Sequence, residues 1–477
     1  MAIFQTILTS MSMGSFLYNK TASISFKSMS SSFPIIQFQT RLNDDEIAGL
    51  EPYLMMSERG HPIAFEGRAD PQKAVKNKIQ RLRSGYGPED CNTIIVEGAP
   101  GAGKTSLLRH IKEKISSEKI NQDVIPLMFG SGAVNDPVLF LQEFLKHRKV
   151  DFERLSYSYT KKGTGKVDFK LFQMGRGVSH HFPSLADRVR NSPGEVWGVI
   201  RESLKNNDDP IFLLLIDESQ RIEKNSENTN TLVVDMHNVM DLGGLKIIPV
   251  FAGLSDIARC LAKVGITRPA DSKFKLRLLE PEEGAHVCLS TIKKLKIDKL
   301  LNDEDLKLVC MLLDNASDGW PRHLHHYLRY FVNEVFNSHR DGRDNMDLRY
   351  VLDLGHDNRI RYYQDRMNLV EFDLGGTVLN RIARESEADS TMSLEELTEA
   401  FEGVIDDVQE VKALINSYVH IGILDENLDG TYEFPIPSLQ TFLANDRDVA
   451  ATTKIMQRVR VRLSGQSLCK VKWRRCR

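Results

Sequence analysis

Apolar runs of strand length alternate with helical stretches between residues 93 and 279. The predicted strands are residues 93–97, 124–129, 211–217, 246–252 and 274–279. Helical periodicity separates the strands, as in 105–115 and 137–145, and it also covers most of 44–83. Alternation of this kind is typical of an α/β domain whose parallel sheet is covered by helices on both faces.

The pattern changes after residue 280, and two further domains are predicted. Residues 281–355 are helical throughout, which indicates a small helical lid on the α/β domain of 44–280. The next domain, 356–448, has the order of a winged helix: three helices are followed by a hairpin. The predicted helices are 374–384, 393–401 and 408–421, and the hairpin pairs 423–425 with 432–434 across Asp429-Gly430.

Three segments lie outside these domains. Residues 150–182 alternate around a glycine turn and predict a hairpin insertion, either a partner-binding surface or a decoration without its own function. Residues 1–43 are rich in Ser, Thr and Met and lack the basic start of a secretory signal. For them we expect a disordered leader, an extension from a misassigned start, or a targeting segment resembling a transit peptide. Residues 449–477 form a basic tail.

Composition excludes several classes of protein. A chain of 477 residues with 41% hydrophobic and 27% charged side chains has ample material for folded cores, so extensive disorder is excluded. Apolar stretches stay far below the roughly 18–20 residues of a bilayer span, and we expect no membrane contact. Six scattered cysteines without a CxxC pair favour a reducing, cytoplasmic setting without disulfides or zinc. His323, His325 and His326 share a helix without suitable co-ligands, so we expect them on its surface.

Charge is distributed unevenly, although 63 Lys and Arg nearly balance 65 Asp and Glu. The basic residues of 454–477 could bind a polyanion such as nucleic acid without reading its sequence, or the tail could simply be solvated. The candidate recognition helix of the winged helix, 406–421, carries Lys412 against three acidic residues, and the following hairpin is also acidic. We therefore expect this domain to dock on protein, including its own neighbouring domain, rather than on DNA.

The strongest chemical signal is a complete GxxxxGK[ST] motif between the first predicted strand and a helix. Its backbone N–H groups and the helix N-terminus suit phosphate, Lys104 would reach the terminal phosphates, and the Thr105 hydroxyl would ligate Mg²⁺. ATP and Mg²⁺ are therefore the expected ligands. The predicted nucleotide-binding residues are Gly98, Ala99, Pro100, Gly101, Ala102, Gly103, Lys104, Thr105 and Ser106.

A second signal is the pair Asp217-Glu218 at the end of a buried strand. The carboxyl ends of parallel strands are where open α/β sheets bind ligands. We interpret Asp217 as a ligand of Mg²⁺ and Glu218 as the general base that activates a water molecule. The alternative is that both acids merely cap the next helix.

Three more residues are candidates for the γ-phosphate site. Arg322 starts a lid helix in Gly319-Trp-Pro-Arg322 and could reach the nucleotide, or it is a surface arginine. Arg268 could act on a neighbouring subunit as an arginine finger. Ser255, after the fourth strand, is a candidate polar sensor of the attacking water.

These motifs resemble those of the AAA+ ATPases, in the group that includes the Orc/Cdc6-like initiators and the TniB/ExeA-like ATPases. The resemblance covers about 60–440 and rests on Gly67-Arg68, 98–105 as Walker A, 213–218 as Walker B and 319–322 as sensor 2. It implies the strand order 5-1-4-3-2 and an adenine beside Gly67-Arg68. The sequence departs from the family in lacking a clear sensor 1 residue and in the long spacing between the Walker motifs, which we attribute to 150–182.

The expected function is that of an ATP-binding and ATP-hydrolysing AAA+ protein. A nucleotide-driven conformational cycle would act on a protein or a DNA-bound partner, and we expect a homo-oligomer if Arg268 acts in trans. One alternative is a slow or non-hydrolysing signalling switch that resembles the STAND NTPases. Another is a DNA-acting initiator or transposition regulator.

Overall fold

A computed structural model describes the parts of the chain on which the following account rests. They are residues 35–55, 64–86, 93–147, 184–204, 209–224, 235–236, 239, 245–263, 272–370, 375–386, 390–405, 407–427 and 429–444. All of them belong to one compact unit, Ile35–Arg477. The predicted hairpin of 150–182, Arg268 and the basic tail lie outside the described residues.

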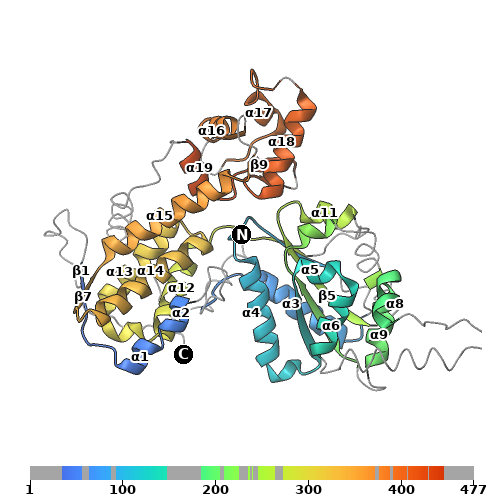
Figure 1. The fold of residues 1–477 in the computed structure, drawn as a ribbon, viewed down its shortest axis with the longest axis horizontal. Coiled ribbons are helices and arrows are strands. Elements are labelled where there is room, and N and C mark those ends of the chain that lie inside the picture. Colours follow the sequence, from blue (N-terminus) through green and yellow to red (C-terminus); the bar gives the residue numbers. More distant parts are fainter. Residues whose placement is uncertain are drawn as a thin grey trace, which may run out of the picture. The chain divides into compact units, whose positions relative to one another are not determined.

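A five-stranded parallel sheet forms the centre of the α/β domain (Figure 1). Its strands are β2 (Ile94–Glu97), β3 (Val124–Phe129), β4 (Ile211–Ile216), β5 (Lys246–Gly253) and β6 (Ser272–Lys275). They lie in the order β3-β4-β5-β2-β6, and every adjacent pair is parallel. Numbered from the strand that precedes the glycine-rich motif, this is the order 5-1-4-3-2, and the predicted fold class is confirmed.

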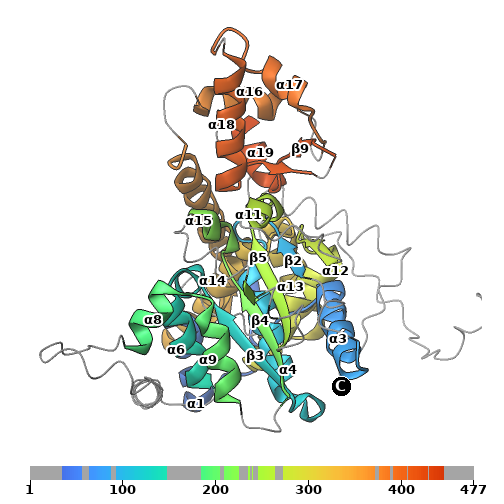
Figure 2. The same ribbon diagram turned by 90° about the vertical axis from the view of Figure 1, so that its right-hand side faces the viewer.

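Helices cover both faces of the sheet, because its central strands are apolar on both sides. In β4, Leu213 and Leu215 belong to one core, together with α3 (Ala69–Arg83) and α4 (Lys104–Ser117). Phe212 and its alternating neighbours belong to the opposite core. That second core is closed by α5 (Ser131–Asn135), α6 (Pro137–His147), α8 (Leu185–Asn191), α9 (Glu195–Ser203) and α11 (Ile257–Lys263) (Figure 2).

The fifth strand is shifted from its predicted position at 274–279. Strand β6 spans Ser272–Lys275 and pairs residue for residue with the four residues of β2. Pairing stops where β2 gives way to the glycine-rich loop, after a last bond from Leu276 N to the Glu97 carbonyl at 2.7 Å. The apolar residues that suggested a longer strand are buried without being in one: Leu276 and Leu279 pack against neighbouring segments.

The lid consists of four longer helices and a small two-stranded sheet. The helices are α12 (Pro281–Lys294), α13 (Asp303–Ser317), α14 (Pro321–Arg340) and α15 (Leu348–Met367), with a 3-10 turn η6 (Ile297–Leu300). Strand β7 (Asn345–Asp347) interrupts the helical region that the sequence predicts, because it pairs antiparallel with β1 (Ile35–Gln37). Residues 35–43, predicted to belong to the leader, are therefore ordered against the lid, where Arg41 also contacts Asp344 at 2.7 Å.

Helices α1 (Asp44–Ala48) and α2 (Glu51–Met55) continue this N-terminal connection to the lid. Arg329 of α14 donates to the Leu54 carbonyl at 2.8 Å. None of the helices that the structure describes has the length and the apolar composition of a bilayer span.

Helix α15 runs through the predicted boundary at residue 355. The backbone of Gly355 lies against the ring of Tyr327 on α14. A Cβ atom there would come within 2.1 Å of Tyr327 Cε1. The glycine thus permits close packing of two long helices, and α15 continues from the lid toward the C-terminal domain.

Residues 375–444 form what we call the C-terminal module. It comprises α16 (Gly375–Glu385), α17 (Leu394–Glu399), α18 (Val408–Ile421), β8 (Asp425–Glu426), β9 (Tyr432–Glu433) and α19 (Pro437–Ala444). Its hairpin pairs Asp425 with Glu433, so the first strand begins two residues after the predicted position. Helix α19, which the sequence pattern did not predict, packs against α16.

Candidate functional site

The glycine-rich loop connects the carboxyl end of β2 to the first turn of α4. Gly101 and Gly103 have φ angles of +95° and +93°, in the left-handed region that glycine enters at little cost. Helix α4 begins at Lys104, so its free N–H groups and partial positive charge face the loop. Such an N-terminus suits an anionic group such as phosphate.

Lys104 is buried at the base of this loop. Its ammonium donates to the carbonyls of Gly98 at 2.6 Å and Ala99 at 3.1 Å. Burial lowers the pKa of Lys104, while the nearby charges of Glu218 and Asp217 raise it. A desolvated cation beside open N–H groups provides a strong attraction for phosphate oxygens.

Thr105 and Asp217 meet although 112 residues separate them. The Thr105 hydroxyl donates to Asp217 Oδ2 at 2.6 Å, which brings the end of β4 to the first turn of α4. Burial raises the pKa of Asp217, and the bond from Thr105 lowers it. A hydroxyl and a carboxylate oxygen beside a phosphate-binding loop form a donor set that fits Mg²⁺.

Glu218 leaves the end of β4 in the left-handed conformation, with φ of +56°. For a residue other than glycine this costs roughly 1–3 kcal/mol, and such strain is concentrated at functional sites. The Glu218 carboxylate accepts from Gln220 Nε2 at 3.0 Å and lies 3.6 Å from Arg221. It remains half-exposed, so water can reach it.

The start of α14 lies directly on the glycine-rich loop. A Cβ atom on Gly101 would be 3.0 Å from Arg322 Cβ and 2.8 Å from Trp320 Nε1. Trp320 is fully buried, and its indole N–H has no hydrogen-bond partner in the described part of the chain. Arg322 therefore lies beside Gly101, and its role as sensor 2 stays a prediction.

The sequence interpretation missed a contact from α15. The Tyr362 hydroxyl donates to the Pro100 carbonyl of the loop at 2.7 Å, and Arg366 lies one turn further along the same helix. Their i,i+4 spacing puts them on one helix face, but nothing in the pattern indicated that this face meets the loop.

The C-terminal module also reaches this region. A Cβ atom on Gly422 would lie 2.5 Å from Pro100 Cδ. Two residues after β5, the predicted sensor Ser255 is buried near the module's Asp425. Asp425 therefore lies close to the residue that was predicted to contact the attacking water.

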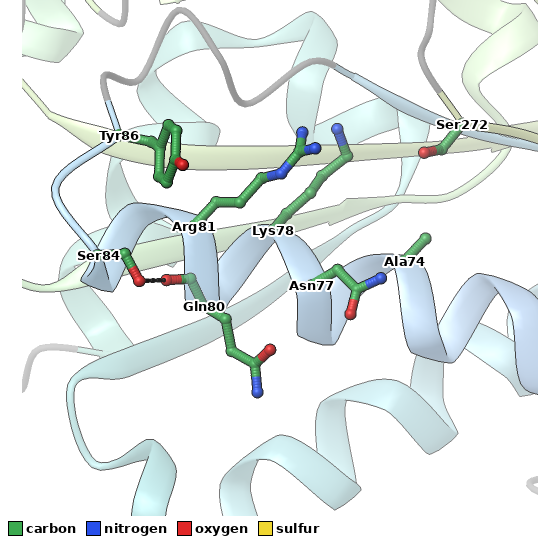
Figure 3. Close-up of a pocket in the computed structure, with 8 residues that line it drawn as sticks. All are labelled: Ala74, Asn77, Lys78, Gln80, Arg81, Ser84, Tyr86 and Ser272. Carbon is green, nitrogen blue, oxygen red and sulfur yellow. Dashed lines mark hydrogen bonds between the residues drawn. The ribbon is translucent and has the colours of Figure 1, made fainter.

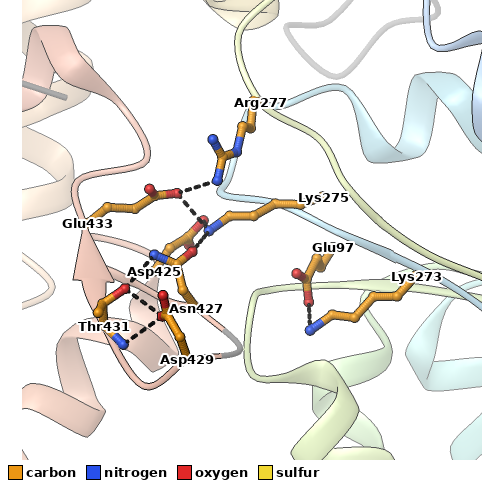
Figure 4. A network of polar contacts seen from close by, with 9 residues as sticks. All are labelled: Glu97, Lys273, Lys275, Arg277, Asp425, Asn427, Asp429, Thr431 and Glu433. Atoms are coloured by element: carbon orange, nitrogen blue, oxygen red, sulfur yellow. Dashed lines mark hydrogen bonds and ion pairs between the residues drawn. The ribbon is translucent and has the colours of Figure 1, made fainter. Parts of the chain in front are cut away.

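Lys275 of β6 binds the hairpin of the module (Figure 4). Its ammonium lies 2.7 Å from Glu433, 2.8 Å from Asn427 Oδ1 and 3.2 Å from Asp425. We call these four residues the Lys275 cluster. Burial raises the pKa of Asp425, and Lys275 lowers it.

Gly67-Arg68, expected beside the adenine, directly precedes α3. Both residues are left-handed, and a Cβ atom on Gly67 would lie within 2.3 Å of a Glu283 carboxylate oxygen. Phe65 stacks on His110 of α4 with ring centroids 4.5 Å apart. The segment thus lies between α4 and the first lid helix.

The expectation that the three histidines lie on the surface of α14 is wrong for two of them. His323 and His326 are buried, not on the helix surface: His323 lies 3.0 Å from the Tyr363 hydroxyl, and burial lowers its pKa well below the usual value.

A cavity of about 610 Å³ is lined by Asn77, Arg81, Ser272 and neighbouring residues (Figure 3). Ser272 pairs with the first residue of β2, so this cavity lies at the end of the sheet opposite the glycine-rich loop.

Comparisons with known proteins support the fold. Residues 88–261 match a family model described as an AAA domain. No curated protein sequence matches the chain. The structure is similar to the ORC2 protein of Aeropyrum pernix, with a TM-score of 0.51, 14% identity and coverage of 89% of this chain and 100% of that one.

Two further solved structures have lower scores. The Walker-type ATPase of Pyrococcus abyssi has a TM-score of 0.45 at 12% identity, covering 80% of this chain and 97% of that chain. Cdc6p of Pyrobaculum aerophilum has a TM-score of 0.40 at 14% identity, covering 89% and 100%. The domain match, the strand order and the similarity to ORC2 agree on the fold. The chain therefore has the AAA+ P-loop fold, with a match to an AAA domain at residues 88–261.

Proposed function

We propose that this protein binds ATP with Mg²⁺ and hydrolyses it, and that the nucleotide state controls its conformation. The contact between Thr105 and Asp217 at 2.6 Å carries the proposal, because it joins the two Walker motifs beside Lys104. The similar ORC2 structure is of ADPNP–ADP complexes, which agrees with a nucleotide site in this fold.

Each residue of the site has a distinct chemical role in this proposal. Lys104 and the loop N–H groups would hold the β- and γ-phosphates, and Thr105 and Asp217 would hold Mg²⁺. Bound Mg²⁺ supplies neutralisation of phosphate charge. Glu218, half-exposed beside this site, would accept the proton of the attacking water. Arg322 would contact the γ-phosphate from the lid.

We further propose that the C-terminal module is a winged helix that docks on its own AAA domain. The acidic residues of its hairpin, which would repel DNA phosphates, are paired with Lys275 of the sheet. This pairing supports docking on protein rather than on DNA. DNA contact through 454–477, homo-oligomerisation with Arg268 acting in trans, and a separate protein partner remain predictions.

A slow, STAND-like switch is a second candidate, and one observation favours it. Gly422 of the module lies against Pro100 of the phosphate-binding loop, so the docked module restrains the loop. Release of the module would then limit nucleotide exchange or turnover.

The two candidates differ in their steady-state ATPase rate. We would measure the rate per subunit against protein concentration, with and without duplex DNA, for wild type, Lys104→Ala and Glu218→Gln. Lys112→Ala, on the same helix as Lys104, is the matched control. ATP binding that survives Lys104→Ala would exclude this loop as the site. Turnover unchanged in Glu218→Gln would remove Glu218 as the base, and tight binding with near-zero turnover throughout would favour the slow switch.

A further inference from the structure

The end of helix α15 is joined to the phosphate-binding loop by Tyr362. This side chain is buried, and its hydroxyl donates to the Pro100 carbonyl at 2.7 Å. A neutral hydrogen bond of this length fixes the ring relative to the loop. Residues held by that ring are therefore held near the phosphate position.

Two guanidinium groups lie at the Tyr362 ring. The Arg322 Cζ atom is 4.6 Å from the ring centroid, and the Arg366 Cζ atom is 5.5 Å from it. Both distances are in the range of cation–π attraction. The tyrosine thus gathers the predicted sensor arginine and a second arginine beside the same loop.

Arg366 has contacts that a phosphate could replace. Its guanidinium donates to the Ile421 carbonyl at 3.1 Å, at the C-terminus of α18, where the helix carries partial negative charge. Within the described residues, no carboxylate forms an ion pair with Arg366.

We propose that Arg366 is a second phosphate-binding arginine, which reaches the terminal phosphate of a nucleoside triphosphate from α15, and that Tyr362 is its positioning residue. The inference rests on the proposed nucleotide site. A planar guanidinium can donate two parallel hydrogen bonds to phosphate oxygens, whereas Arg366 donates only one to the Ile421 carbonyl. On phosphate binding, Arg366 exchanges the Ile421 carbonyl for the nucleotide. That exchange links the phosphate state to α18 of the C-terminal module.

The test is the affinity of the full chain for ATP and ADP, measured with Mg²⁺ by titration calorimetry. Arg366→Ala should weaken ATP binding about tenfold to a hundredfold, as expected for loss of a charge-assisted contact, and weaken ADP binding less. Arg366→Lys should lie between the wild type and Arg366→Ala. Arg361→Ala, an exposed arginine on the same helix, is the matched control and should leave both affinities unchanged.

A purely structural role for Arg366 would change the melting temperature without nucleotide and leave the ratio of ATP to ADP affinity intact. That result, or wild-type ATP affinity in Arg366→Ala, overturns the inference. Tyr362→Phe provides a second arm: it keeps the ring but loses the bond to Pro100, and it should reduce the ratio of ATP to ADP affinity. If the wild type binds no ATP, or if Lys104→Ala binds it normally, the proposed nucleotide site fails instead.

Discussion

Replacing Lys275 by methionine tests whether the Lys275 cluster holds the C-terminal module on the sheet. Methionine keeps the length and apolar stem of the lysine but removes its charge. The substitution affects Asp425 and Glu433, the two acids that pair with Lys275, to different extents. Glu433 keeps a cation, because Arg277 lies 3.5 Å away, whereas Asp425 loses its ion-pair partner in a buried position.

The expected cost follows from that burial. The side chain of Asp425 is only 2% exposed, and that of Lys275 is 16% exposed. Removing one partner of a buried ion pair costs about 3–5 kcal/mol, and the partial exposure of Lys275 favours the lower end, about 3 kcal/mol. This corresponds to roughly a hundredfold increase in the opening equilibrium of the hairpin.

Amide hydrogen exchange of the hairpin is the appropriate assay. Strands β8 and β9 have two residues each and would be marginal without support, so loss of the cluster should expose their amides. Protection of the bond from Tyr432 N to the Met392 carbonyl should fall about a hundredfold in Lys275→Met. The double variant Lys275→Met/Asp425→Leu should recover most of the lost protection of the Tyr432 amide, because neither member of the buried ion pair remains.

Lys273→Met is the matched control. Lys273 lies on the same strand and pairs with buried Glu97 at 2.8 Å, inside the α/β domain (Figure 4). Its loss should destabilise the sheet without selective exchange in the hairpin. Equal exchange of the hairpin in Lys273→Met and Lys275→Met would refute a docking role for Lys275.

The pKa of Asp425 gives the experiment a pH dependence with a definite sign. Because burial raises this pKa, the docked module binds a proton more readily than the open module does. Protonation of Asp425 therefore favours docking at pH values below the ordinary pKa of an aspartate. This contribution to docking is lost as the pH rises through the raised pKa of Asp425 in the docked module. Removal of Lys275 raises the pKa further, so the defect of Lys275→Met should be smaller at pH 5.5 than at pH 8.

Two further predictions concern the lid. Gly355→Ala should lower the melting temperature, since the added Cβ would meet Tyr327 at 2.1 Å, whereas Gly198→Ala, with no atom within 4 Å, should not; equal melting temperatures would contradict close packing at Gly355. Asp318→Asn should lower the melting temperature more than Arg359→Met does. Asp318→Asn leaves the charge of Arg359 without its carboxylate, and the Arg359 side chain is only 1% exposed, whereas that of Asp318 is 27% exposed. The reverse order would show that the buried guanidinium does not depend on that carboxylate.

The sheet and its glycine-rich loop could be predicted because their signals are local. A strand buried on both faces must be apolar along its length, as β4 is, and the order of strands and helices restricts the topology. The glycines of the loop are required by left-handed backbone, so the motif itself indicates the geometry. The contact of Thr105 with Asp217 then follows from two motifs that meet at one edge of a parallel sheet.

Features that depend on distant packing could not be predicted. Gly355 resembles a helix end in sequence but permits an approach to Tyr327, and His323 is polar by type although it is buried against Tyr363. In the same way, the length of β2 limits where β6 can pair, and the apolar residues of 274–279 do not indicate that limit. Each error arose where a neighbouring element, rather than the local pattern, decides the structure.

The role of the acidic residues in the C-terminal module also depends on the elements that it packs against. When the module is considered alone, its acidic hairpin argues against DNA binding. The structure shows that these acids instead pair with cations of the same chain. Asp425 and Glu433 surround Lys275 of the sheet, while Arg366 binds the carboxyl end of α18 beside the phosphate-binding loop. Negative charge on the module therefore complements cations of its own chain near the glycine-rich loop. A triphosphate brought to that loop would compete for one of these cations, Arg366, and so would weaken a bond that links α15 to the module.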